Sequence, residues 1–296
     1  MTKPQNSSAK LAYPALFTSV DRAAAEQQGK FFTLKVVELS AIVAGSLVGV
    51  LAADDLWGTA GGVAVVCFLI AAAIRISGNG QVAEKRWYDA RAAAESVKSL
   101  SWQYAVAGEA FRRTDTNPDA VFVNQLRTIL TAVPHLDIPA GSDPGVTQSM
   151  RELRAAEQAE RQRRYISERV QDQVDWYAQK ANWNKRRSLA WSAAVVLVEL
   201  LAVCLGIARI SGAIEVDLLG VLGAFSAGLI AWIQAKNYTE LSESYSVTSH
   251  EVGMVASTVR AATTEEVWAQ NVHDAEAAFS REHTMWLARR QSRLSM

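Results

Sequence analysis

Two glutamates lie within long apolar stretches of this 296-residue chain, and their type and position suggest function more strongly than any others. Glu38 lies near one end of its stretch, whereas Glu199 lies deeper in another. An unpaired carboxylate in hydrocarbon costs roughly 2–4 kcal/mol, so such a residue pairs with another group, is protonated, or faces a polar cavity. Both are candidates for an intramembrane site or pathway. A packed, hydrogen-bonded acid is the alternative, and Glu38 could also reach interfacial water.

Metal or catalytic chemistry has little support elsewhere in the sequence. None of the four histidines belongs to a metal-binding motif such as H-E-x-x-H, and no nucleophile or phosphate-binding motif occurs. His273 and His283 are ten residues apart, which places them on different faces of a helix. The two cysteines, Cys67 and Cys204, lie inside apolar stretches and are typical of packed thiols. We therefore expect no enzyme activity, metal or cofactor.

The apolar stretches predict four transmembrane helices in two hairpins. The first pair covers about residues 36–53 and 56–76, and the second covers about residues 189–210 and 216–233. A helix of about 20 residues spans the roughly 30 Å hydrocarbon core. The predicted fold class is an all-α integral membrane protein, in which four spans join long cytoplasmic helices that form a stalk or bundle.

The second hairpin repeats the first at a constant offset of 161 residues. The matching residues are Val37-Glu38-Leu39 with Val198-Glu199-Leu200, Gly45 with Gly206, and Gly62 with Gly223. A repeat in a single register indicates duplication. Small and apolar residues align easily by chance, but acids are scarce in membrane spans, so the repeated glutamate favours duplication.

The distribution of basic residues predicts the orientation of the spans. The turns at residues 52–57 and 211–218 contain no Lys or Arg, whereas the opposite ends of the spans contain many. These basic residues are Lys30, Lys35, Arg75, Lys85, Arg86, Lys180, Lys185, Arg186, Arg187 and Lys236. By the positive-inside rule, both termini and the long middle segment are cytoplasmic. The chain has 30 basic and 30 acidic residues, so its net charge gives no indication of nucleic-acid binding.

Composition divides the chain into two similar units. We expect a polar N-terminal tail at residues 1–30, a first two-transmembrane unit at 31–133, a linker at 134–146, and a second unit at 147–296. The linker is predicted because residues 134–145 hold three prolines and two glycines.

The polar segments are expected to be helical. Apolar residues recur at three- and four-residue steps over about residues 82–113 and 147–187, and a short helix ending near Ala132 follows the capping groups at 115–117. The chain after the fourth span also has helical periodicity. Such faces favour helix partners within and between subunits, and a solvated stalk is the alternative.

Small residues recur at every fourth position in three of the spans, a pattern that favours close helix packing in membranes. They are Ala41, Gly45, Gly49 and Ala53, then Gly58 and Gly62, then Gly220, Ala224 and Gly228. We expect at least one of these ladders to form an interface between subunits, although contacts within a hairpin would use the same residues.

Aromatic and charged residues that flank the hairpins resemble the pattern of SLATT domains, the SMODS and SLOG-associated two-transmembrane effectors. After the first hairpin the matching residues are Arg86, Trp87, Tyr88, Arg91, Glu95, Lys98 and Trp102. Around the second they are Tyr165, Arg169, Gln173, Trp176, Tyr177, Lys180, Ala181, Asn184, Trp268, Glu276, Phe279, Glu282, His283 and Trp286. The chain resembles two such units in tandem.

The resemblance implies an antiviral defence or conflict effector in the bacterial inner membrane. Such a protein is expected to form a homo-oligomer and to make a pore or perturb the membrane. We see no appended sensor domain, so the trigger would be a separate cytoplasmic sensor protein or a nucleotide second messenger. One alternative is a non-conducting scaffold or receptor that recruits cytoplasmic partners. A weaker one is a housekeeping ion channel or small-solute transporter. In each case the partner is the lipid bilayer rather than nucleic acid.

Overall fold

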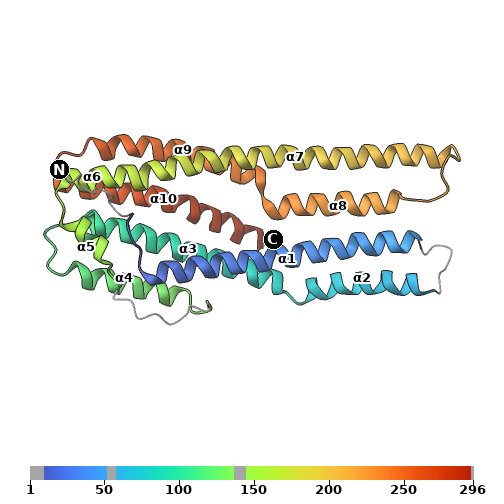
Figure 1. The fold of residues 1–296 in the computed structure, drawn as a ribbon, viewed down its shortest axis with the longest axis horizontal. Helices are drawn as coiled ribbons and strands as arrows, with labels where there is room; N and C mark the ends of the chain where they lie inside the picture. Colours follow the sequence, from blue (N-terminus) through green and yellow to red (C-terminus); the bar gives the residue numbers. More distant parts are fainter. Residues whose placement is uncertain (1–9, 52–57, 137–144, 295–296) are drawn as a thin grey trace, which may run out of the picture. The chain divides into compact units, whose positions relative to one another are not determined.

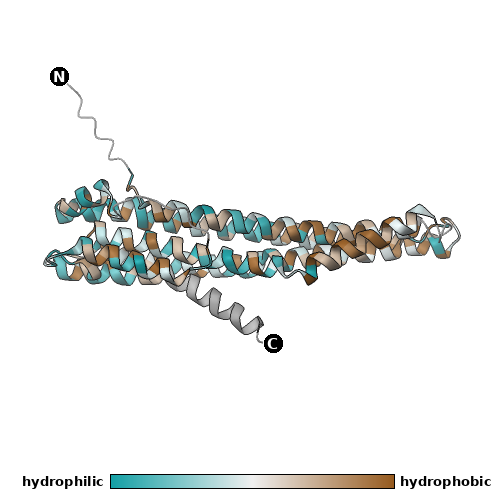
Figure 2. Cartoon of the chain, turned by 90° about the horizontal axis from the view of Figure 1, so that it is seen from below, coloured by the Kyte–Doolittle hydropathy of each residue, from teal (hydrophilic) through white to brown (hydrophobic). Residues whose placement is uncertain are grey.

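The computed structural model describes residues 10–51, 58–136 and 145–294, with side chains described as far as Phe279. Within these ranges the regular elements are helices and no strand occurs. Four helices are long and apolar enough to cross a membrane. Their membrane portions are coloured predominantly as hydrophobic in Figure 2. The expected all-α membrane fold is therefore confirmed. The predicted turn at 52–57 and most of the linker fall outside the described residues.

The chain forms two compact units, and each unit contains segments from both halves of the sequence. The polar unit comprises Met1–Glu26, Arg86–Gln179 and Ser244–Met296. The membrane unit comprises Gln27–Lys85 and Lys180–Glu243. The two consecutive units expected from the sequence are therefore not the compact units of the fold, because both hairpins belong to one unit.

Two helical hairpins form the membrane unit (Figure 1). The first hairpin pairs the later part of α1 (Ala15–Leu51) with α2 (Thr59–Ile76). The second pairs the later part of α7 (Gln171–Ile210) with α8 (Leu219–Lys236). α8 ends at Lys236, and the next residue, Asn237, has a φ of 52° in the left-handed region, which separates α8 from α9 (Tyr238–Arg260).

The polar unit is a bundle of shorter helices. They are α3 (Asn79–Ala105), α4 (Pro118–Ala132), α5 (Gln148–Ala155), α6 (Gln158–Tyr165), α9 (Tyr238–Arg260) and α10 (Glu265–Leu294), with a 3-10 turn η1 (Glu109–Phe111) and a π-helical turn η2 (Ile166–Val170). Asn117 caps α4, because its side chain accepts a hydrogen bond from the Ala120 amide, as the sequence predicts. Trp102, Tyr165 and Trp268 are almost fully buried in its core.

Residues 15–30, which belong to the segment expected as a polar N-terminal tail, are helical. α1 begins at Ala15 and buries Val20 and Ala24 against Ala90 and Ala94 of α3. The buried residues of this part of α1 are mostly small and lie between charged residues. The sequence of a helix with such a narrow apolar face looks like that of a solvated segment.

Two other predicted helices are interrupted. The helix expected at 82–113 ends at Ala105, because Ala107 has a φ of 59°. The helix expected at 147–187 breaks at Ala156, whose backbone is extended, and again changes pitch at η2. Gly78, with a φ of 66°, separates α3 from α2, so α3 does not continue the membrane helix.

Candidate functional site

Glu38 forms ion pairs with two cations near the end of the first hairpin. Lys35, one turn earlier on α1, donates to Glu38 Oε2 at 2.9 Å. Arg75, in the last turn of α2, donates through Nε to Oε1, also at 2.9 Å. The Glu38 side chain is only 5% exposed. Both carboxylate oxygens have cationic partners, so this geometry is that of a packed acid within an ion-pair network.

Glu199 has a much less complete environment. It is exposed on α7, and its hydrogen-bond partner among the described residues is the Ser226 hydroxyl of α8, which donates to Oε1 at 3.3 Å. Ser226 itself is buried. Within the part of the chain that the structure describes, no ion pair includes Glu199. An exposed residue in the middle of an apolar membrane helix faces either lipid or another protein chain.

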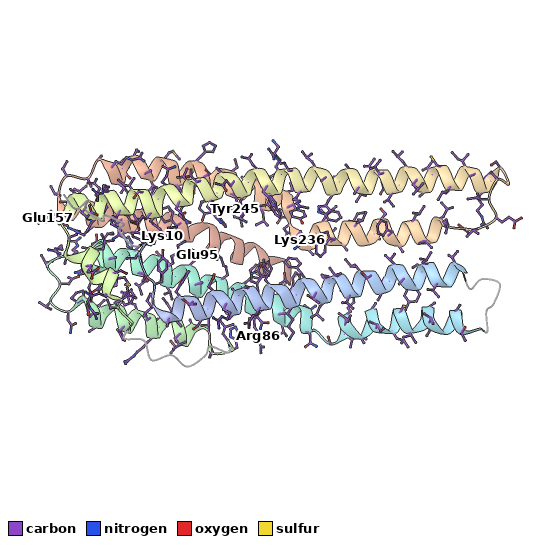
Figure 3. The ribbon with its side chains drawn as sticks, viewed as in Figure 1. Lys10, Arg86, Glu95, Glu157, Lys236 and Tyr245 are labelled. Carbon is purple, nitrogen blue, oxygen red and sulfur yellow. The ribbon has the colours of Figure 1, made fainter. Side chains whose placement is uncertain are left out.

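Because Glu38 and Glu199 occupy equivalent positions of the repeat, the residues around them can be compared position by position. At the offset of 161 residues, the position equivalent to Lys35 is Val196, so the second hairpin lacks that cation. The position equivalent to Arg75 is Lys236, but its ammonium lies over the ring of Phe32, 3.2 Å from the ring centroid. Figure 3 labels Lys236 at the end of α8. The second acid has therefore lost both of the cations that neutralise the first.

Only some glycines of the predicted ladders lie close to another helix of the same chain. A Cβ at Gly45 would lie 3.2 Å from ring atoms of Phe68, so this glycine allows α1 to approach α2 closely. A Cβ at Gly49, Gly62 or Gly220 would have no neighbouring atom within 4 Å. Contacts within a hairpin therefore explain Gly45 but leave these other glycines facing open space.

The remaining ladder residues have mixed environments. Gly58 is the N-cap of α2, and Ala224 is partly buried on α8. A Cβ at Gly228 would lie 3.8 Å from Val43, an ordinary contact. Ala53 falls outside the described residues.

A buried ion pair lies in the core of the polar unit. Glu276 of α10 accepts hydrogen bonds from Arg169 Nε at 3.0 Å and Nη2 at 2.7 Å, and from the Tyr165 hydroxyl at 2.9 Å. The side chains of Arg169 and Glu276 are at most 1% exposed. Arg169 lies in the π-helical turn η2, an irregularity that is frequent at functional positions.

Burial and the neighbouring charges shift the pKa values of Tyr165 and Arg169 in this cluster. Burial raises the pKa of the Tyr165 hydroxyl well above its usual range, and the nearby Glu276 carboxylate raises it further. Burial lowers the pKa of the Arg169 guanidinium, but the attraction of Glu276 is larger and the net pKa is raised. Tyr165 therefore stays neutral and Arg169 stays charged at neutral pH.

Two buried arginines were not predicted as site residues from the sequence. Arg154, 9% exposed, donates to the backbone carbonyls of Tyr104, Phe111 and Arg112. Arg161 donates to the carbonyl of Val106 at 2.8 Å. Both arginines hold the segment after α3 in place. The signal that could have identified Arg161 is its four-residue spacing from Tyr165 and then Arg169, which places all three on one helical face.

Several residues of the family pattern pack helices together in the polar unit. The indole of Trp102 donates to the Tyr13 hydroxyl at 2.9 Å. Trp176 and Tyr177 on α7 both contact the ring of Tyr245 on α9. These aromatic residues join elements that are far apart in the sequence.

Other pattern residues lie along α3. Trp87 stacks on Tyr88 with ring centroids 4.4 Å apart, and Arg91 pairs with Glu95 at 2.6 Å. Burial lowers the pKa of Lys98 below its ordinary value. Arg86 and Glu95 are labelled in Figure 3. Glu282, His283 and Trp286 lie outside the residues whose side chains are described.

Asp119 is a partly exposed acid of the polar unit with two hydrogen-bond partners. It accepts a hydrogen bond from the Tyr104 hydroxyl and pairs with Arg151 Nη2 at 2.9 Å. Burial raises the pKa of the Asp119 carboxyl, but its two partners outweigh burial and lower the net pKa below the ordinary value. Burial, together with the Asp119 carboxylate, raises the pKa of Tyr104 to about 12.

We expect Asp119→Asn to destabilise the full chain at neutral pH by up to about 1 kcal/mol, as for an exposed ion pair. Because the folded-state pKa is lowered, the wild-type advantage is complete above the ordinary value of about 4 and is lost as pH falls through the folded-state value. Thermal unfolding of detergent-solubilised protein between about pH 3 and pH 7 measures this difference. The exposed Asp115→Asn is the control, and a wild-type advantage that is equal at every pH would contradict the assignment.

The fold and these sites define a helical membrane protein with two apolar hairpins in one unit and a buried ion-pair core in the other. The chain belongs to the SLATT family: SMODS and SLOG-associating 2TM effector domain 3 matches residues 14–162, and effector domain 1 of the same series matches residues 165–286. SLATT domains are effector domains of bacterial conflict systems. The predicted tandem is confirmed, although the two matches meet between residues 162 and 165 rather than at the linker. Comparisons with curated proteins and with solved structures find no match.

Proposed function

We propose that this chain is a defence effector of the bacterial inner membrane, and that several copies associate to form a conducting path or to perturb the bilayer. Glu199 carries the proposal, because it is an exposed acid in the middle of an apolar helix with a hydroxyl as its partner. Against lipid this residue would cost roughly 2–4 kcal/mol. A neighbouring copy, or a water-filled path between copies, removes that cost.

The number of spans supports association. One chain offers four helices long enough to cross a membrane among its described residues, too few to enclose a wide path. Identical subunits usually close into a symmetric ring. Gly49, Gly62 and Gly220 have open space beside them, and glycine on a membrane helix allows a second helix to approach closely.

The polar unit is the part that a trigger would reach. Basic residues at the ends of the spans favour a cytoplasmic location for this unit and for both termini. A separate sensor protein or a nucleotide second messenger in the cytoplasm could then shift the equilibrium between a closed and an open assembly by binding one of them more tightly.

Ion flux and membrane potential test the proposal directly. Purified protein reconstituted in vesicles, and cells with induced expression, would be compared for wild type, Glu199→Gln and Glu215→Gln. We expect Glu199→Gln to change the flux or its cation selectivity, because it replaces the acid beside the path with an amide. Glu215, exposed outside the span of the same hairpin, is the matched control and should leave both unchanged. Glu38→Gln should instead lower stability, because two cations lose their carboxylate.

Water access provides a second readout that does not require an open state. In a background lacking Cys67 and Cys204, the thiol introduced by Glu199→Cys should react with a charged, membrane-impermeant reagent in the assembled protein. A thiol introduced by Leu197→Cys, on the exposed apolar surface of the same helix, should be unreactive. Monomeric protein in the bilayer, with no flux and no reaction at either thiol, would contradict the proposal and favour the non-conducting scaffold.

A further inference from the structure

A hollow of about 530 Å³ opens in the membrane unit between the first hairpin, the start of α3 and α8. α1, α2, the start of α3 and α8 all contribute to its wall. It lies at the end of the hairpin that carries the basic residues, next to the point where α2 ends at Ile76. A span that ends at Ile76 would place the hollow near the boundary between hydrocarbon and lipid headgroups.

The wall of the hollow is apolar on one part and polar on another. Phe31, Leu34, Ile74, Ala231 and Ala235 form the apolar part. Lys35, Glu38, Arg75, Gln81, Glu84 and Gln234 form the polar part. A ligand that fits both parts must itself be amphipathic, with a polar end that hydrogen-bonds and an apolar end that replaces lipid contacts.

The polar part presents hydrogen-bond donors beyond those that Glu38 uses. Arg75 and Lys35 share the two oxygens of this one carboxylate, and neither cation has another partner among the described residues. The Arg75 side chain is 73% exposed. Its guanidinium can therefore bind a second anionic group without leaving Glu38, since it has five donors.

The start of α3 adds a second feature that favours a phosphate group. Gly78 and Gly80 line the hollow, and α3 begins at Asn79. The first backbone N–H groups of a helix lack helical acceptors and carry partial positive charge. A Cβ at Gly80 would have no atom within 4 Å, so a ligand can approach the backbone here.

We propose that this hollow binds the phosphate of a phospholipid headgroup, with the start of an acyl chain against its apolar wall. Arg75 and Lys35 hold the phosphate, and the pair with Glu38 fixes their position. Such a lipid would lie between the first hairpin and α8 within the membrane unit. The proposal is independent of whether the assembled protein conducts ions.

Native mass spectrometry of the full chain, extracted from vesicles of phosphatidylcholine and phosphatidylglycerol, tests for a retained lipid. We expect wild type to retain phospholipid, and Ala231→Leu with Ala235→Leu to reduce retention about tenfold, because these changes fill the hollow without altering charge. Glu38→Gln with Arg75→Gln should have a similar effect and leaves no unpaired buried carboxylate. Ala193→Leu, on the exposed surface of α7, and Lys85→Gln, outside the hollow, are the controls.

Inorganic phosphate and pyrophosphate distinguish the source of the ligand. If either competes with the lipid in wild type but does not bind the filled variant, the phosphate site is supported. If phosphate or pyrophosphate binds to the same residues and no lipid is retained, the hollow is a phosphate site whose ligand is a soluble phosphate rather than a lipid. Equal lipid retention by wild type, the filled variant and the charge variant would overturn the proposal, as would the absence of both lipid and phosphate binding.

Discussion

Glu276→Gln is expected to destabilise the folded chain by about 3–5 kcal/mol, because it leaves the charged Arg169 buried without its carboxylate. Glutamine keeps the shape of the side chain and can still accept a hydrogen bond from Tyr165, so the loss reports on charge rather than on a cavity. Chemical unfolding of the full chain in detergent, followed by tryptophan fluorescence, measures the change. Trp102 and Trp268 both contact the ring of Tyr165, at centroid distances of 5.8 Å, and therefore report on this core.

Two further variants give this experiment its controls. Glu266→Gln changes an exposed acid on the same helix and should alter stability by less than about 0.5 kcal/mol. Glu276→Gln combined with Arg169→Met should recover most of the loss, because an apolar replacement of a buried pair is often close to neutral. A single variant as stable as wild type, or a double variant less stable than the single one, would show that the pair does not stabilise the core.

The membrane spans and their duplication could be predicted because both leave a direct pattern in the sequence. Long apolar runs indicate spans whatever their neighbours are, and the repeated glutamate at positions 38 and 199 indicates a common origin. The asymmetry between these two acids depends on which side chains reach them. Arg75 reaches Glu38, whereas Lys236 turns towards an aromatic ring. The position equivalent to Arg75 therefore keeps a cation, but the sequence does not predict which group that cation contacts.

The polar helices were predicted less well because their breaks depend on tertiary contacts. Ala107 adopts a left-handed backbone that alanine rarely prefers on its own. Arg154 binds the carbonyls of this segment, and this tertiary contact favours the break. An arginine in a charged helix usually indicates a solvated face, so the burial of Arg154 and Arg161 could not be predicted from residue type. The family pattern did identify Trp268 and Glu276, both of which lie in the core.

Trp268→Ala is expected to cost about 3–5 kcal/mol, because it removes a large, fully buried side chain. Trp268→Phe separates packing from hydrogen bonding: it keeps most of the ring but removes the Nε1 donor that bonds the Val106 carbonyl at 2.7 Å. We expect it to cost about 1–2 kcal/mol, since Arg161 still donates to the same carbonyl. Chemical unfolding in detergent, followed by circular dichroism, measures both variants.

Arg161 and Trp268 both donate to the Val106 carbonyl, so their contributions to stability should be coupled. A double variant tests this coupling. Trp268→Phe with Arg161→Met leaves a buried carbonyl unsatisfied, so its cost should exceed the sum of the single costs by about 1 kcal/mol or more. Trp183→Phe, at a half-exposed position on α7, should cost less than about 0.5 kcal/mol. Val106 belongs to the first matched domain and Trp268 to the second, so this coupling would measure how strongly the tandem domains depend on one shared core. Additive costs would mean that each domain stabilises its own half independently.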